Sequence, residues 1–299
     1  MTEGIIFRAL SGFYHVRAGE ETIVCKARGR FRLDGTSPLV GDRVSCTRDR
    51  DGSGRIDKVL PRRNWFIRPA VANIDALVFV AANTEPVTDP FLIDRVAVLA
   101  ADAGCELIVC INKTDLDRGE ELEAIYRRAG YCVVCTSAEN GDGIEELRQA
   151  LRGKICAFTG NSGVGKSSLL NALAPELALR TGEISEKLGR GRHTTRHVEL
   201  FSLGGESYVA DTPGFASFEI ACMRIIPKEE LQYDMPDFAP YLGHCRFPDC
   251  SHRREPECAI RSAVDAGEIS VSRYRSYLRL YELSAQHKPW DKAFQTAAE

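Results

Sequence analysis

The order of five short motifs restricts the folds that this chain can adopt. Asn112–Asp115 and Thr136–Ala138 come first, the glycine-rich segment Gly160–Ser167 follows, and Thr194–Thr195 and Asp211–Gly214 come last. In proteins with the usual order of these motifs, the glycine-rich segment comes first. The motifs found here at Asn112–Asp115 and Thr136–Ala138 then come last. Here the second half precedes the first, so we expect a circularly permuted α/β domain.

The glycine-rich segment has the features of a phosphate-binding loop. It fits the pattern GxxxxGK[ST] and follows an apolar run, Ile155–Thr159, with the composition of a strand. Glycines let backbone N–H groups surround a phosphate, and the following helix directs its positive end at the anion. We expect Lys166 to pair with β- and γ-phosphate oxygens and Ser167 to ligate Mg²⁺. The nucleotide-binding residues expected here are Gly160, Asn161, Ser162, Gly163, Val164, Gly165, Lys166, Ser167 and Ser168.

The Asn-Lys-Thr-Asp motif predicts which base is bound. Asp115 can accept hydrogen bonds from the ring N–H and the exocyclic amine of guanine, and adenine presents neither in that arrangement. We expect Asn112 and Lys113 to brace the loop and the base plane. Ser137 and Ala138 complete the expected guanine site, with the Ala138 N–H as donor to the guanine carbonyl.

The last two motifs have the features of switch elements that contact a terminal phosphate. We expect Asp211 to hold the Mg²⁺ shell through water and the Gly214 N–H to contact the γ-phosphate. One threonine should complete the Mg²⁺ shell, and we favour Thr195 over Thr194. The expected catalytic residues are Lys166, Ser167, Thr195, Asp211 and Gly214.

The residue after the switch glycine is Phe215. Ras-like enzymes carry a glutamine there that orients the attacking water, and a phenyl ring cannot do so. We therefore expect slow intrinsic hydrolysis and activation from outside. His193 is an alternative water-orienting group, although a loop histidine without a catalytic role is the simpler interpretation.

Strand-like and helix-like segments alternate between about residues 71 and 222, as in a mostly parallel, doubly wound sheet. The expected strands are Asp75–Ala82, Glu106–Ile111, Cys132–Cys135, Ile155–Thr159, Val198–Leu203 and Tyr208–Ala210. The expected helices are Pro90–Asp102, Glu120–Ala129, Gly143–Leu151 and Lys166–Leu173. Every nucleotide motif falls at the carboxyl end of a strand, where ligand loops lie in such sheets.

Residues 1–68 contain short β-prone segments and turns typical of a small barrel, with an OB-like fold as the leading candidate. They carry 14 basic and 8 acidic side chains, whereas residues 69–222 carry 14 basic and 22 acidic ones. On a strand, Arg28, Arg30 and Arg32 would share one face. This distribution suggests a nucleic-acid partner for the N-terminal part, with a solvated basic surface as the alternative.

A cysteine and histidine cluster follows residue 223. Cys245, Cys250, His252 and Cys258 supply three thiolates and one imidazole within 14 residues. That closed set suits tetrahedral, structural Zn²⁺, so we expect one zinc ion per chain. Chance clustering of buried cysteines is the alternative. A helix is expected over Ser272–Ser284.

No run of about 18 apolar residues is present, and the first residues lack the features of a secretory signal. Scattered cysteines outside the cluster fit free thiols in a reducing compartment. We expect a cytoplasmic monomer without a membrane partner.

Together these residues resemble the RsgA/YjeQ family, circularly permuted GTPases that act on the bacterial small ribosomal subunit. The resemblance rests on the motif order, the GRGRHTT and DTPG segments and the CxxxxCxHxxxxxC cluster, and it covers essentially the whole chain. It implies an OB-fold domain over 1–68, a permuted GTPase domain over 69–222 and a zinc-binding helical domain over 223–299.

The resemblance also implies binding of GTP and GDP, contact with 16S rRNA, hydrolysis stimulated by the 30S subunit, and a role in its late maturation. Gly163 stands where permuted relatives often carry a potassium-binding asparagine, so potassium activation is not expected.

Two functions of different class fit these observations. One is a GTP-hydrolysing assembly factor bound to 16S rRNA. The other is a GTPase switch for a protein or metal-delivery partner, with the barrel and zinc site as protein-docking modules. The basic N-terminal part favours the first.

Overall fold

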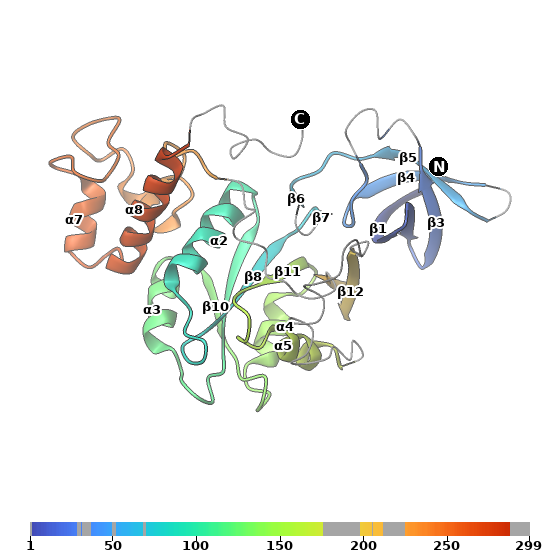
Figure 1. Ribbon diagram of the computed structural model, residues 1–299, viewed down its shortest axis with the longest axis horizontal. Coiled ribbons are helices and arrows are strands. Elements are labelled where there is room, and N and C mark those ends of the chain that lie inside the picture. The colour runs from blue at the N-terminus through green and yellow to red at the C-terminus, as the bar shows by residue number, and fades with distance from the viewer. Residues whose placement is uncertain are drawn as a thin grey trace.

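This computed structural model describes residues 2–28, 31, 37–49, 52–67, 70–175, 198–204, 206–211 and 225–287 of the chain. Figure 1 shows three parts along the longest axis: a barrel, a central sheet with helices on its faces, and a C-terminal group of helices. Within the described part of the chain, no helix has the length and apolar character to span a bilayer.

The N-terminal part is a five-stranded barrel. Its strands are β1 (Thr2–Leu10), β2 (Phe13–Ala18), β3 (Glu21–Ala27), β4 (Arg43–Arg48) and β5 (Gly54–Val59). They pair in the order β1-β2-β3-β5-β4, and an additional β1–β4 pairing closes the ring. This closure removes open strand edges within the barrel and confirms the OB-like fold.

The barrel interior follows from alternation along each strand, since successive side chains point to opposite faces. The inward positions are apolar and buried: Ile6, Val16, Ile23, Cys25, Val44, Cys46 and Ile56. Beyond the barrel, β6 (Trp65–Ile67) and β7 (Ala70–Ala72) form a separate antiparallel pair.

The central sheet has the strand order β10-β9-β8-β11-β13-β12. Its strands are β8 (Ala76–Ala82), β9 (Glu106–Asn112), β10 (Cys132–Cys135), β11 (Ile155–Thr159), β12 (Val198–Gly204) and β13 (Ser207–Asp211). All neighbouring pairs are parallel except β12–β13. Strand β11, which leads into the glycine-rich segment, comes after β8, β9 and β10 in the chain, and this order is the signature of the permutation.

Two helix layers cover this sheet. Helices α2 (Pro90–Asp102) and α3 (Glu120–Arg128) pack on one face, and α4 (Ile144–Ala150) and α5 (Lys166–Leu173) pack on the other. Both faces are therefore buried, which explains the wholly buried run of β8. The predicted α/β class is confirmed, and each predicted bound in this part agrees with the observed one or differs from it by one residue.

The C-terminal part contains the 3-10 helix η3 (Pro236–Tyr241) and the helices α7 (Ala259–Asp265) and α8 (Val271–Ala285). These pack around their own apolar cluster, which also takes in Phe91 and Val98 of α2. The predicted division at residues 68 and 222 stays a proposal.

A buried arginine joins this C-terminal part to α2. Arg273 of α8 is fully buried and donates hydrogen bonds to Asp94 of α2 and to Asp237, both at 2.6 Å. It also contacts the Tyr131 hydroxyl at 3.3 Å. Burial raises the pKa of Asp94, and the positive charge of Arg273 opposes that shift. The buried charges hold α8 on α2.

Replacing this arginine is expected to destabilise the protein strongly. Arg273→Ala leaves two buried carboxylates without their cation, and breaking a buried pair in this way costs about 3–5 kcal/mol. Urea unfolding followed by circular dichroism measures the loss. The control is Arg127→Ala, which removes an exposed pair with Glu123 on α3 worth about 0.3–0.5 kcal/mol. A midpoint shift in Arg273→Ala no larger than in the control would contradict this account.

Candidate nucleotide site and metal centre

The phosphate loop leaves β11 and ends where α5 begins at Lys166. Gly160 and Gly165 have φ values of 134° and 93°, which disfavour any side chain. A Cβ at Gly160 would lie 2.2 Å from the Val80 carbonyl oxygen, and one at Gly165 would lie 2.3 Å from Asn112 Nδ2. These two glycines therefore allow the loop to lie directly against β8 and the end of β9.

Lys166 lies inside this loop. Its Nζ donates to the carbonyl oxygens of Gly160 at 2.8 Å and Asn161 at 2.6 Å. The side chain is buried, and that burial lowers its pKa to about 8. An anion beside the amine would stabilise its charged form, as expected of a phosphate-binding lysine. Ser167 and Ser168 follow on the first turn of α5 and are half-buried.

Asn112 joins the base motifs to the phosphate loop. Its Nδ2 donates to the Val164 carbonyl at 2.9 Å. Its Oδ1 accepts from Thr136 Oγ1 at 3.1 Å and from the Ala138 N–H at 3.2 Å. One buried side chain thus links three loops that are far apart in the sequence.

Asp115 lies at the open side of this junction. One of its carboxylate oxygens accepts a hydrogen bond from Ser137 Oγ at 2.6 Å, and the residue is exposed. The Ser137 hydroxyl itself accepts from the Asn140 N–H at 3.2 Å. The carboxylate is therefore held in one orientation while remaining accessible to a base.

The loop between β8 and α2 was missed by the sequence analysis. Lys113 Nζ donates to the Glu85 carbonyl at 2.5 Å, so this loop fixes the lysine of the base motif. On the phosphate side, a Cβ at Gly163 would lie 3.4 Å from Pro86 Cδ. The sequence did offer a signal for this loop, because it directly follows the buried strand β8. Ligand loops gather at the carboxyl ends of parallel strands.

Asp211 is the last residue of β13, which pairs in parallel with the strand that leads into the phosphate loop. That topology brings the carboxyl ends of both strands to one edge of the sheet. Several predicted residues lie outside the described part of the chain: Arg30, Arg32, His193, Thr194, Thr195, Gly214 and Phe215. Their predicted roles stay predictions.

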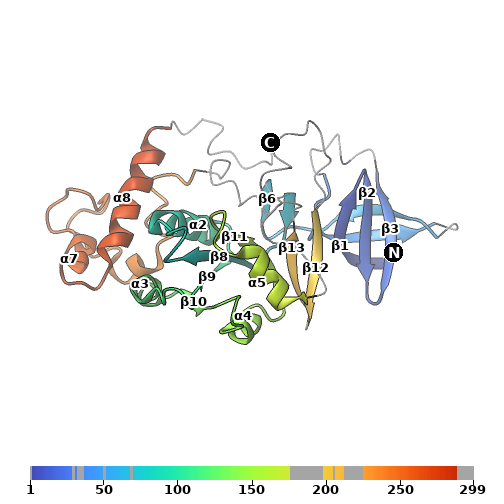
Figure 2. The same cartoon turned by 60° about the horizontal axis from the view of Figure 1, so that its bottom comes forward.

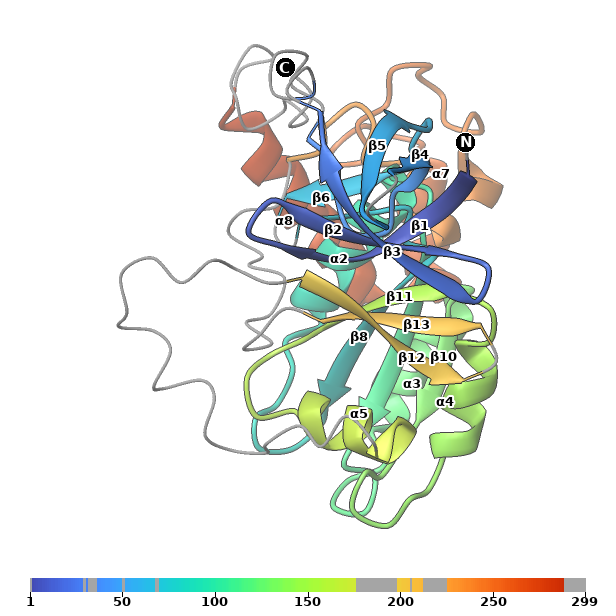
Figure 3. The ribbon, with the colours of Figure 1, turned by 90° about the vertical axis from the view of Figure 1, so that its right-hand side faces the viewer.

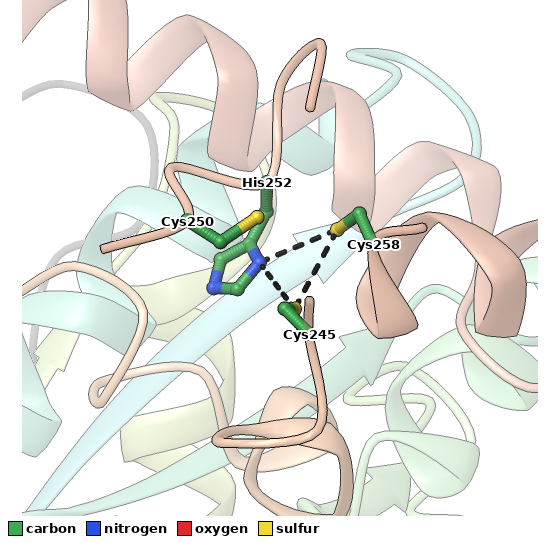
Figure 4. A group of neighbouring side chains, drawn as sticks. All are labelled: Cys245, Cys250, His252 and Cys258. Atoms are coloured by element: carbon green, nitrogen blue, oxygen red, sulfur yellow. Dashed lines mark hydrogen bonds between the residues drawn. The ribbon is translucent and has the colours of Figure 1, made fainter. Parts of the chain in front are cut away.

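The four residues of the cysteine and histidine cluster converge in the C-terminal part, as Figure 4 shows. Their ligand atoms all lie within 4.8 Å of one another. His252 Nδ1 lies 3.5 Å from Cys245 Sγ and 3.4 Å from Cys258 Sγ. Its other ring nitrogen lies 2.8 Å from the Gln232 side-chain oxygen. As a donor to this oxygen, Nε2 leaves Nδ1 free for a metal ion.

Burial of the cluster shapes its protonation. It raises the pKa of Cys250 to about 12 and lowers that of His252, so the imidazole is neutral near pH 7. A divalent cation would displace the thiol protons and form a closed Cys₃His set. The neighbouring His244 is exposed and is not part of the cluster.

Comparisons with known proteins agree with this geometry. A family model described as RsgA GTPase matches residues 59–221, and the RsgA N-terminal domain model matches residues 3–56. The chain belongs to the RsgA GTPase family. As a member of that family it is a GTP-hydrolysing enzyme, and the predicted resemblance is confirmed.

Similar proteins cover nearly the whole chain. The small ribosomal subunit biogenesis GTPase RsgA of Caldanaerobacter subterraneus is 47% identical over 281 residues, 93% of this chain and 94% of that protein. The protein of the same name from Alkaliphilus metalliredigens is 44% identical over 285 residues, 94% of this chain and 97% of its own length.

Solved structures show the same architecture. YjeQ from Thermotoga maritima superposes with a TM-score of 0.81 at 39% identity, covering 96% of this chain and 99% of that one. YloQ, described as a circularly permuted GTPase, gives a TM-score of 0.79 at 36% identity and covers 97% of each chain. The permuted fold is therefore shared by RsgA relatives.

We expect the substitution Asp115→Asn to change which base the protein prefers. Asp115→Asn removes a charge-assisted acceptor for guanine, worth about 1.5–3 kcal/mol, so GTP affinity should fall about 10- to 100-fold. Xanthosine triphosphate should bind better, because its second carbonyl accepts from the new amide. Competition titration with both nucleotides measures the exchange.

The matched control is Asp117→Asn. Asp117 is two residues away and accepts from the Gly119 N–H at 2.8 Å, within the same loop. This control should retain the wild-type preference for GTP. Unchanged GTP affinity in Asp115→Asn would refute the assignment of the base motif.

Proposed function

We propose that this RsgA-family GTPase is a late assembly factor of the small ribosomal subunit. In this proposal it binds 16S rRNA through its barrel, the subunit stimulates GTP hydrolysis, and hydrolysis releases the protein. The main support for this proposal is the side chain of Asn112, which ties the base motifs to the phosphate loop. The barrel adds a surface with an exposed aromatic ring and a cation, which suits RNA. The relatives' name, small ribosomal subunit biogenesis GTPase, supports the choice of partner.

The candidate RNA surface lies on the outer side of β2 and β3. Phe13 is 42% exposed and pairs in register with Lys26, whose Nζ lies 5.1 Å from the ring centre. Val24 is also exposed on β3. An exposed ring beside a cation offers a stacking surface for a base and a contact for its phosphate. Arg28 differs, because its guanidinium contacts Asp57 at 2.5 Å.

Two ions complete the proposal. Mg²⁺ would bind with GTP, held by Ser167, Thr195 and, through water, Asp211. One structural Zn²⁺ per chain would bind Cys245, Cys250, His252 and Cys258. Three thiolates and an imidazole favour zinc over the oxygen-seeking cations.

The zinc assignment predicts a selective loss in Cys258→Ser. The variant should lose the metal and loosen the C-terminal helices, while GDP binding persists because the nucleotide loops lie elsewhere. Metal analysis of purified protein measures zinc per chain. Cys132→Ser, at an exposed thiol on β10, should keep one zinc ion. Far less than one zinc in wild-type protein purified without chelators would contradict the assignment.

Ribosome binding is tested by co-sedimentation with 30S subunits at several salt concentrations. Affinity should fall steeply with salt, because phosphate contacts release counterions. Lys26→Ala should weaken binding and reduce the magnitude of the logarithmic salt slope by about 1. Phe13→Ala should weaken binding at every salt concentration by about 1–3 kcal/mol with the slope unchanged.

Arg152→Ala serves as the control, since this exposed arginine lies after α4 in the central part. It should bind like the wild type. No binding to 30S subunits at low salt, with GTP hydrolysis intact, would exclude the proposal and favour a protein partner.

A further inference from the structure

The barrel and the GTPase part share one sheet. Strand β1 pairs antiparallel with β12, with Arg8 opposite Glu199 and Ala9 opposite Val198. Figures 2 and 3 show β12 and β13 running beside the barrel strands. A second backbone contact lies elsewhere, where Val40 bridges Val71 of β7 and accepts a hydrogen bond from the Ala72 N–H at 2.8 Å.

The pairing of β1 with β12 lies level with the carboxyl end of β13. Glu199 pairs with Arg8 on one side and with Asp211 on the other. Three strands therefore place Arg8, Glu199 and Asp211 in one row across the sheet. Asp211 is the residue proposed to hold the Mg²⁺ shell, so the row connects the barrel to the reaction centre.

Side chains strengthen the junction at two points. Arg8 Nε lies 3.4 Å from Glu199 Oε2, and both side chains are partly exposed. On β13, the Tyr208 ring packs edge-on against Phe7 with centroids 4.9 Å apart. Arg17 of β2 stacks on Phe7 at 4.2 Å and lies 3.4 Å from the Tyr208 hydroxyl, to which it donates.

The position of β13 depends on both its neighbours. On one side it pairs with β11 through Tyr208 and Val209, and β11 leads into the phosphate loop. On the other side it pairs with β12, whose far edge is occupied by the barrel. A displacement of the barrel thus reaches β13 by a continuous line of backbone pairs and by direct contacts to Tyr208.

We propose that Arg8 is a positioning residue for GTP hydrolysis, acting through Glu199 on the backbone at Asp211. The barrel is then a working part of the GTPase centre, and a ligand that moves it changes the hydrolysis rate. This extension rests on the proposed function only where it takes that ligand to be the RNA of the small subunit.

Charge reversal tests the row in the full-length protein without any subunit. Arg8→Glu places two carboxylates opposite each other and should lower kcat about 5-fold, which corresponds to about 1 kcal/mol, the upper end for a partly exposed ion pair. The KM for GTP should stay within about twofold, because the base and phosphate loops are unchanged. Amide exchange in residues 207–211 of the nucleotide-free variant should become faster.

The swapped pair provides the rescue. Arg8→Glu combined with Glu199→Arg should restore both kcat and amide exchange. The matched control is Arg43→Glu, since Arg43 of β4 forms another exposed ion pair of the barrel, at 3.8 Å from Glu3 of β1. This control should keep wild-type kcat. An unchanged kcat in Arg8→Glu, or unchanged amide exchange in residues 207–211, would overturn the positioning role.

The subunit is added in a second arm. Stimulation of wild-type hydrolysis by 30S subunits should be lost in Arg8→Glu and regained in the swapped pair. If 30S subunits do not stimulate the wild type, the proposed function fails, while the subunit-free kcat comparison still decides the role of Arg8.

Discussion

The hydrogen bonds of Asn112 are the contacts on which the nucleotide site depends. They tie the end of β9 to the Val164 carbonyl of the phosphate loop and to Thr136 and Ala138 of the second base motif. These loops are far apart in the sequence, since Asn112 is 24 residues from Thr136 and 52 residues from Val164. The fold preserves the site because parallel strands bring their carboxyl ends together regardless of which strand comes first.

Permutation also determines what can be attached to the core. The barrel precedes β8 and joins the sheet edge through β1 and β12, while the C-terminal helices follow β13 and dock on α2 through Arg273. Both attachments use specific charged contacts as well as apolar packing. The barrel attachment reaches Asp211 through one intervening strand, β12, which offers a partner a direct route to influence hydrolysis.

The sequence was sufficient to predict most of the helices and strands that lie next to a nucleotide-binding motif. The bounds of α2, β10, β11 and α5 agree with the prediction, because periodic apolar residues and glycine-rich ends mark them. The β1–β12 pairing was not predicted, since nothing local specifies which distant edge a strand will join. Arg273 was also missed, because an arginine on an amphipathic helix normally faces solvent and only tertiary structure supplies two buried carboxylates.

We propose that a small-subunit partner completes the GTPase centre, because Phe215 stands where Ras-like enzymes carry a water-orienting glutamine. GTP turnover by the full-length protein, measured alone, with 30S subunits and with 50S subunits, tests it most directly. We expect slow turnover of the protein alone, a large increase with 30S subunits and no increase with 50S subunits. Equal turnover in all three mixtures would contradict it.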